Sequence, residues 1–169
     1  MTRNHPASLA DQETNDDWRC RALQERPGFL VRRLHQIHVA LFMEECASEG
    51  MTPVQYSVLT ALEQIGATEQ VVLSRAVGLD RTTTAEVIAR LEQRKLVKRR
   101  ASSKDKRMKT ASLTEVGKAL LERVQISAAR AHSRTLAPLS PADRTVFLKS
   151  LMKLVEANND ISRSPVESI

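Results

Sequence analysis

The chain has 169 residues and a hydrophobic fraction of 41%, which is enough for one domain with a real core and excludes an intrinsically disordered protein. Its 26 Lys and Arg residues outnumber its 20 Asp and Glu residues, and the resulting net charge of +6 favours a polyanionic partner. Aromatic residues make up only 3% of the chain while helix-forming residues abound, so we expect a mainly α-helical fold.

Sequence motifs exclude several other classes of protein. The chain has no Gly-rich phosphate loop, GxSxG turn or HExxH helix, so we expect neither an enzyme nor a cofactor. Cys20 and Cys46 form no CxxC pair, so we expect reduced thiols and no metal site. The N-terminus lacks the apolar centre of a secretory signal, and no apolar run approaches the roughly 20 residues that cross a bilayer. These features predict a cytoplasmic protein without membrane contact.

Two helices are expected in the first third of the chain, after a polar, mobile arm at residues 1–25. The first helix runs from Pro27 to about Ser48, with apolar residues at helical spacing and Gly50 as its stop. The second begins at Thr52-Pro53-Val54-Gln55, where Thr caps the helix, Pro suits its first turn and Gln completes a capping box. Both helices therefore have clear boundary signals.

The pattern then changes to two short helices around a tight turn. One runs from about Glu69 to Val77 and ends at Gly78, and Asp80 caps the next. This is the layout of a helix-turn-helix. The second helix opens with Arg81 and three threonines, although β-branched residues lose rotamer freedom in a helix. Short hydroxyls and an Arg at a helix start suit phosphates and base edges in the major groove. The alternative is that the threonines only cap and pack the helix.

Residues 98–109, KRRASSKDKRMK, are the most basic part of the chain. Between Arg94 and Lys109 there are nine Lys or Arg and one acid, Asp105. Two short runs around a charged, Ser-containing tip predict a β-hairpin. A hairpin beside a helix-turn-helix is a winged helix, whose tip can enter the minor groove, and Asp105 would there orient Arg107 by a charge-assisted hydrogen bond. The alternative is a basic loop held in solvent.

Two more helices complete the expected fold. Thr114 caps a long helix that Pro138 ends, and Ser140-Pro141 opens the last helix. Residues 159–169 are expected to be a disordered tail. Both terminal regions carry long apolar stripes that one small winged domain would not cover, which predicts an interface with a second copy.

These residues resemble the MarR family of transcriptional regulators. Asp105-Lys106-Arg107 and the later Leu113-Thr114-Glu115-Val116-Gly117 are similar to the family's wing signature, and residues 52–59 (TPVQYSVL) are similar to its second-helix motif. The resemblance covers residues 27–157. Lys95 departs from it, since the family often has Gly after the recognition helix; a left-handed Lys there is expected to cost on the order of 1 kcal/mol.

The resemblance implies an obligate homodimer. Residues 26–50 and 114–158 would be dimerisation helices, and residues 51–113 a winged helix-turn-helix. The partner would be double-stranded DNA with a pseudo-palindromic operator, and a small anionic aromatic ligand would release a repressor from it. The first-helix segment PGFLVRRLHQIHVALFMEE is similar to repressors of nicotinate catabolism within the family, which points to a hydroxylated pyridine carboxylate.

Two sets of residues are predicted to form sites. The residues expected to contact DNA are Ser74, Arg75, Arg81, Thr82, Thr83, Thr84, Arg90, Lys104, Asp105, Lys106 and Arg107. The residues expected to bind the ligand are Trp18, Arg32, His35, His38 and Tyr56. Imidazoles, a guanidinium and a phenol can together hold a carboxylate on an aromatic ring; alternatively, the histidines only pack at the dimer seam.

Three other hypotheses remain open at this stage. A metal-responsive regulator would use the histidines with ligands from Glu44, Glu45 and Cys46, although these lie well along the helix from His35. A redox-responsive regulator would use Cys20, whose neighbours are both Arg, or Cys46. A general nucleic-acid-binding protein would need only the basic charge.

Overall fold

A computed structural model describes residues 17–101 and 109–167 of the chain. The chain divides into two compact units, residues 1–36 and residues 37–169, and the boundary falls within the first long helix, α1 (Pro27–Glu45). The first unit also holds a short 3-10 helix, η2 (Leu23–Glu25). The expected hairpin tip, with Lys104, Asp105, Lys106 and Arg107, lies outside the described residues.

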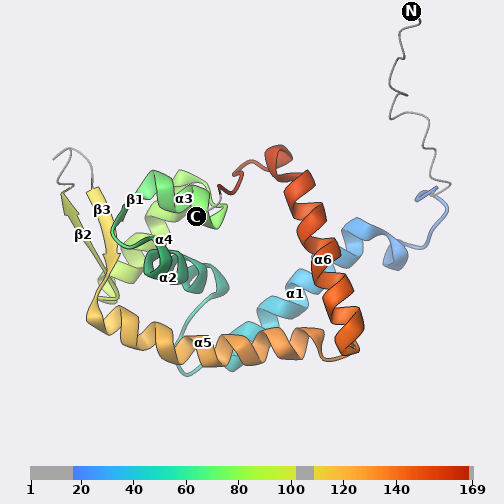
Figure 1. The fold of residues 1–169 in the computed structure, drawn as a ribbon, viewed down its shortest axis with the longest axis horizontal. Helices are drawn as coiled ribbons and strands as arrows, with labels where there is room; N and C mark the ends of the chain where they lie inside the picture. Colours follow the sequence, from blue (N-terminus) through green and yellow to red (C-terminus); the bar gives the residue numbers. More distant parts are fainter. Residues whose placement is uncertain (1–16, 102–108, 168–169) are drawn as a thin grey trace, which may run out of the picture. The chain divides into compact units, whose positions relative to one another are not determined.

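The second unit contains the remaining elements in the order that the sequence predicts, with one additional strand (Figure 1). They are α2 (Pro53–Ile65), β1 (Thr68–Glu69), α3 (Gln70–Val77), α4 (Arg81–Gln93), β2 (Val97–Ala101), β3 (Lys109–Leu113), α5 (Glu115–Leu136), α6 (Pro141–Ala157) and the 3-10 helix η3 (Asn159–Ile161). The prediction of a mainly helical winged helix-turn-helix is confirmed. No helix within the described residues is long and apolar enough to cross a membrane.

The helix starts follow the capping residues. The Thr52 hydroxyl accepts a hydrogen bond from the Gln55 amide at 3.2 Å, and the Gln55 side chain accepts one from the Thr52 amide at 3.2 Å, so the predicted capping box is present. Thr114 caps α5 by accepting from the Gly117 amide, and Ser140 caps α6 by accepting from the Asp143 amide. These bonds satisfy amides that have no partner inside the helix.

The sheet has three antiparallel strands in the order β1-β3-β2. Strands β2 and β3 are the expected hairpin, paired from Val97 opposite Leu113 to Ala101 opposite Lys109. Strand β1 pairs Thr68 with Ala111 across the other edge of β3. The sequence did not indicate β1, because a strand of two residues is too short to show an alternating pattern.

The core of the second unit lies between α2, α3, α4, α5 and the inner face of the hairpin. Ala111 and Leu113 alternate into it from β3. Its largest fully buried side chains include Phe42, Met51, Leu59, Leu62, Leu73, Ile88, Leu91 and Leu121. This core holds the two helices of the helix-turn-helix and the wing strands in one rigid arrangement.

Lys95 is the single non-glycine residue with a left-handed backbone among the described residues, with φ of 59°. It ends α4 as the family's glycine would: the Lys95 amide donates to the Glu92 carbonyl at 2.8 Å, and the Leu96 amide donates to the Leu91 carbonyl at 3.0 Å. These two bonds form a Schellman motif. The strain expected at Lys95 from the sequence therefore has a structural basis.

Lys95→Gly is expected to stabilise the protein by about 1 kcal/mol, because glycine adopts the left-handed conformation without a Cβ clash. The free energy of unfolding in urea measures the effect. Lys98→Gly is the matched control, since Lys98 is exposed in β2 and a glycine there weakens a strand. A Lys95→Gly variant that unfolds at lower urea than the wild type would contradict the interpretation.

Candidate functional site

The turn of the helix-turn-helix is closed by Gly78. Its φ of 64° is left-handed, and its amide donates to the Ser74 carbonyl at the end of α3. The Leu79 amide donates to the same carbonyl at 3.0 Å. Gln70, at the start of α3, donates from its side chain to the Arg81 carbonyl at 2.8 Å, so the starts of the two helices are linked. The position of the α4 N-terminus is thus set by hydrogen bonds on both sides.

The three threonines at the start of α4 have different roles. Asp80 accepts hydrogen bonds from the Thr83 hydroxyl at 2.6 Å and the Thr83 amide at 2.8 Å, and these bonds lower the pKa of the Asp80 carboxyl. Thr84 is fully buried and donates to the Asp80 carbonyl at 2.8 Å. Asp80 is therefore the N-cap of α4, Thr83 donates to it, and Thr84 packs in the core. Arg81 and Thr82 are exposed.

The other expected DNA contacts on these helices are also divided by burial. Ser74 is buried and donates to the Val71 carbonyl at 2.8 Å, so its hydroxyl serves the fold. Arg75 and Arg90 are exposed. The helix-turn-helix therefore presents Arg75, Arg81, Thr82 and Arg90 at its surface, while Ser74 and Thr84 face inward.

In the basic run that leads into the wing (residues 94–100), two of the arginines are bonded within the protein and are not free to contact DNA. The Arg94 guanidinium donates to the carbonyls of Glu49 and Gly50, each at 2.9 Å, and so joins the end of α4 to the loop before α2. Arg99 pairs with Glu92, and this bond holds the pKa of the Glu92 carboxyl below its usual range. Lys98 and Arg100 are exposed on β2.

A cluster of rings and hydroxyls lies where the second half of α1 meets α2 and α5; we call it the aromatic cluster. The His38 ring stacks on the His132 ring with centroids 5.1 Å apart, and its Nδ1 lies 2.9 Å from the Thr135 hydroxyl. The Phe42 ring lies 6.4 Å from the His38 ring and 5.6 Å from the Tyr56 ring. Phe42 thus lies between His38 and Tyr56, two of the residues expected to bind the ligand.

One buried polar atom belongs to the same face of α2. Within the described residues the Thr60 hydroxyl has no hydrogen-bond partner, and Thr60 lies one helical turn from Tyr56. A buried hydroxyl without a partner costs free energy unless a ligand or water satisfies it. Sequence reasoning missed His132 and Thr135, because no local pattern indicates that positions about 95 residues from His38 face it. It also missed Thr60, because the sequence does not show which hydroxyls are buried without a partner.

The other three expected ligand-binding residues belong to the first unit and are exposed. Trp18 has the Arg21 guanidinium 5.1 Å from its ring centroid, and Arg32 lies 5.2 Å from the Phe29 ring centroid. His35 is exposed on α1. Trp18 and Arg32 therefore have local partners within the first unit.

The metal and redox hypotheses find no support in the geometry. Glu45 pairs with Arg130 at 2.8 Å and with Arg134 at 2.7 Å, and Glu44 pairs with Arg134 at 3.0 Å. Cys46 is fully buried, and burial raises the pKa of its thiol. Across residues 17–101 and 109–167, no three His, Cys, Asp or Glu side chains are placed to hold a metal ion. The Cys20 thiol is exposed and donates to Asp17 at 3.3 Å.

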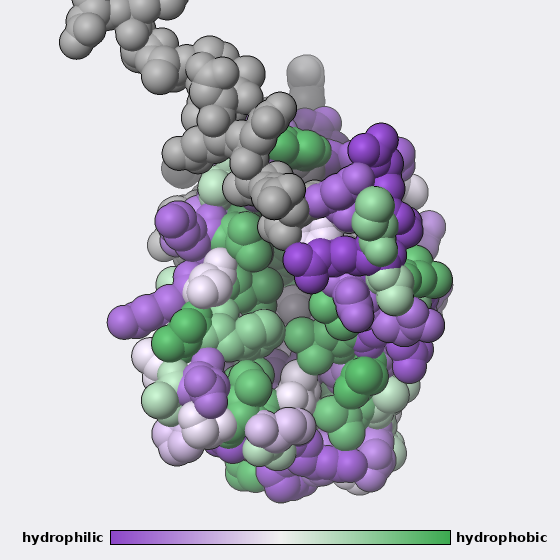
Figure 2. All heavy atoms as spheres, turned by 90° about the vertical axis from the view of Figure 1, so that its right-hand side faces the viewer, coloured by the Kyte–Doolittle hydropathy of each residue, from purple (hydrophilic) through white to green (hydrophobic). Residues whose placement is uncertain are grey.

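Helix α6 has no buried residue, although it is rich in apolar side chains. Val146, Met152 and Leu154 are 63%, 60% and 61% exposed. The space-filling view from the side of α6 shows hydrophobic side chains gathered at the surface (Figure 2). An apolar helix face of this length indicates an interface.

Comparisons with known proteins agree with this geometry. A model of the MarR family matches residues 51–109. The transcriptional repressor NicR of Pseudomonas putida is 29% identical over 136 residues, which cover 80% of this chain and 86% of NicR.

Two solved structures are similar over most of their length. BpsR of Bordetella bronchiseptica, whose DNA binding is regulated by 6-hydroxynicotinic acid, has a TM-score of 0.75 and 34% identity over 79% of this chain and 96% of its own. The repressor CouR of Rhodococcus jostii RHA1, bound to a 23-mer DNA duplex, has a TM-score of 0.75 and 28% identity over 79% of this chain and 94% of its own.

Proposed function

This chain belongs to the MarR family, and we propose that it is a homodimeric, sequence-specific DNA-binding repressor that a small aromatic acid releases from its operator. The named relatives are transcriptional regulators rather than enzymes. The observation that carries the proposal is the exposed start of α4, where Arg81 and Thr82 project beside a capped helix N-terminus.

The start of α4 suits the major groove. A recognition helix inserts its N-terminal residues, and Arg there can donate two hydrogen bonds to a guanine edge. Arg75 and Arg90 are exposed on the same pair of helices and suit phosphate oxygens, which provide affinity without reading sequence. CouR, a protein of similar structure, is bound to DNA. The exposed set therefore combines base-reading and phosphate-binding side chains.

The wing extends this surface in the proposal. Lys104, Lys106 and Arg107 would enter the minor groove beside the site of α4, with Asp105 orienting Arg107. Strands β2 and β3, which lead to this tip, are paired over five residues each. Support for a minor-groove contact comes from this rigid base and from the basic composition of residues 98–109.

The homodimer follows from the uncovered apolar face of α6. A second copy would bury side chains such as Met152 and Leu154, which a monomer leaves in water. A symmetric dimer presents two copies of α4, so its operator should have two inverted half-sites.

Selection of DNA from a random pool tests the proposed function. We expect an inverted repeat with half-site centres about 10 bp apart. Specific sites should bind at least ~10³-fold more tightly than random DNA at physiological salt. Recovery of no inverted repeat, with uniform affinity for all sequences, would instead support a general nucleic-acid-binding protein.

The aromatic cluster is the proposed ligand site. His38 and Tyr56 offer ring faces and polar atoms, and His132 adds a second imidazole. The Thr60 hydroxyl, which has no hydrogen-bond partner among the described residues, lies one turn from Tyr56. Such a site suits an aromatic ring that bears a carboxylate and a hydroxyl. The similarity to NicR and BpsR favours a hydroxylated pyridine carboxylate such as 6-hydroxynicotinic acid. Trp18, Arg32 and His35 remain predicted contacts that the same titration can test.

His38→Ala is expected to raise the concentration of 6-hydroxynicotinic acid needed to release DNA by about tenfold, because one hydrogen bond to a charged group is lost. Fluorescence anisotropy of a labelled operator, titrated with the acid, measures this. Affinity for the operator without the acid should stay unchanged. His35→Ala, on the exposed part of the same helix, tests the other predicted histidine contact in the same titration. A normal response of His38→Ala to the acid would remove His38 from the site.

A further inference from the structure

The C-terminal segment folds back onto the helix-turn-helix instead of forming the disordered tail that the sequence predicts. We call residues Asn159–Glu167 the C-terminal clamp. It begins with η3 and is held in shape by Asn159, whose side chain accepts from the Val166 amide at 2.9 Å and donates to the Val166 carbonyl at 3.0 Å. Figure 1 shows the segment after α6 leading toward the helix-turn-helix.

Three contacts attach the C-terminal clamp to α3 and the turn that follows. The Glu167 carboxylate pairs with the Arg75 guanidinium at 2.9 Å, and the Glu167 amide donates to the Arg75 carbonyl at 3.3 Å. A methyl group of Val166 lies 3.0 Å from where a side chain on Gly78 would begin, so the missing Cβ of Gly78 makes room for it. The clamp is therefore fitted to the turn by shape as well as by charge.

The location of these contacts matters for DNA binding. Arg75 is one of the exposed cations of the helix-turn-helix. Arg75 and Glu167 line a surface pocket, and Arg81 at the start of α4 lines the same pocket. The clamp places a carboxylate on Arg75, where the proposed function places a phosphate. One guanidinium face cannot pair fully with both anions.

We propose that the C-terminal clamp is an autoinhibitory ligand of the helix-turn-helix, which DNA must displace from Arg75 before it binds. This inference rests on the proposed function. Glu167 competes with a DNA phosphate group for Arg75. The contact of Val166 with Gly78 keeps the Glu167 carboxylate close to Arg75. Because the clamp is part of the same chain, its effect does not depend on protein concentration.

The C-terminal clamp inhibits DNA binding weakly and reversibly. The Arg75 and Glu167 side chains are 53% and 64% exposed, so water and salt screen their attraction. Inhibition of this strength lowers the affinity for any DNA by a small factor and does not prevent operator binding. It also becomes weaker as the salt concentration rises.

Glu167→Gln tests the inference, with Asp160→Asn as the matched control. Asp160 is exposed in the same segment, and its replacement removes the same charge without touching the Arg75 pair. We expect Glu167→Gln to bind the selected operator about two- to fivefold more tightly than wild type at low salt. The gain should shrink toward none at high salt, and Asp160→Asn should resemble wild type.

Hydrogen exchange at the Glu167 amide gives an independent measurement of clamp release. The amide should be protected in the free protein and should exchange faster in the DNA complex. Equal operator affinity of wild type and Glu167→Gln, tighter binding by Asp160→Asn to the same degree, weaker binding by Glu167→Gln, or unchanged protection on DNA would each overturn the inference alone. Failure of wild type and both variants to prefer any operator would overturn the proposed function as well.

Discussion

Arg81→Ala is expected to weaken operator binding by about 10- to 100-fold, which corresponds to the 1–3 kcal/mol of a well-placed Arg contact to a base. Arg81 is the first residue of α4 and is exposed, and its backbone is held by the bond from Gln70. The loss should be larger for the operator than for random DNA, because a base contact provides discrimination. Competition binding with both DNAs at several salt concentrations measures it.

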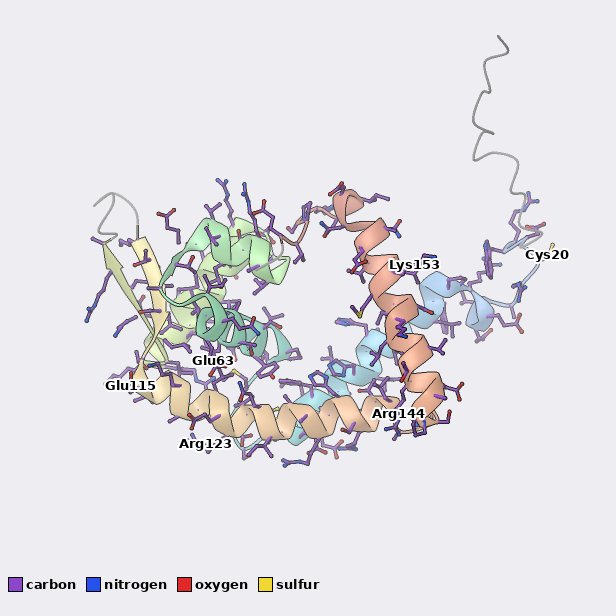
Figure 3. The ribbon with its side chains drawn as sticks, viewed as in Figure 1. Cys20, Glu63, Glu115, Arg123, Arg144 and Lys153 are labelled. Carbon is purple, nitrogen blue, oxygen red and sulfur yellow. The ribbon has the colours of Figure 1, made fainter. Side chains whose placement is uncertain are left out.

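Arg123→Ala is the matched control for this experiment. Arg123 is exposed on α5 and donates to the Ala119 carbonyl of its own helix (Figure 3). Its replacement removes the same charge and should change operator affinity little. If Arg81→Ala weakened binding to all sequences equally and only reduced the salt dependence, Arg81 would be a phosphate contact and not a base contact.

Gly117→Ala is expected to destabilise the protein by about 3 kcal/mol, although Gly-to-Ala changes within helices usually stabilise by about 1 kcal/mol. Gly117 lies in the first turn of α5, where a Cβ would overlap the Leu96 carbonyl oxygen and come within 3.0 Å of its carbonyl carbon. The Thr114 amide donates to that carbonyl at 3.0 Å and the Thr114 hydroxyl donates to the neighbouring Lys95 carbonyl at 2.7 Å. The residues just before β2 are therefore held against α5 and cannot move away without breaking these bonds.

Gly28→Ala provides the opposite expectation within the same chain. Gly28 lies in the first turn of α1, and a Cβ there would meet nothing within 4 Å. Urea denaturation followed by circular dichroism should show Gly117→Ala unfolding at clearly lower urea, and Gly28→Ala unfolding at the same or higher urea than wild type. Equal stability of the two variants would show that the wing is not fixed to α5 through Leu96.

Local rules predicted the order of the main helices and the hairpin and most of the helix starts, but not β1, η3 or the end of α1 at Glu45. The capping box at Thr52, the cap at Asp80 and the stop at Gly78 are all present, because capping depends on residues within one helical turn of each other. The strain at Lys95 was also visible in the sequence, since a left-handed end to α4 follows from the family's usual glycine. These local features predicted the helix-turn-helix and its wing strands.

The threonines at the start of α4 show where such rules stop. The sequence allowed both a DNA-binding role and a structural one, and burial divides the residues between them. Thr82 is exposed, Thr83 donates to the capping residue Asp80, and Thr84 lies in the core. Composition cannot separate them, because which side of α4 faces the core depends on how it packs against α2 and the hairpin.

By itself, the sequence determined the helical composition, the helix-turn-helix, the basic hairpin and the apolar stripes, because each depends on neighbours in the chain. Only the tertiary structure decided which charges are available and which distant groups meet. It assigned Arg94 to the loop before α2, joined His38 to His132, and set Glu167 against Arg75. Those contacts cross 44 to 94 positions of the sequence, and no local periodicity reports on them.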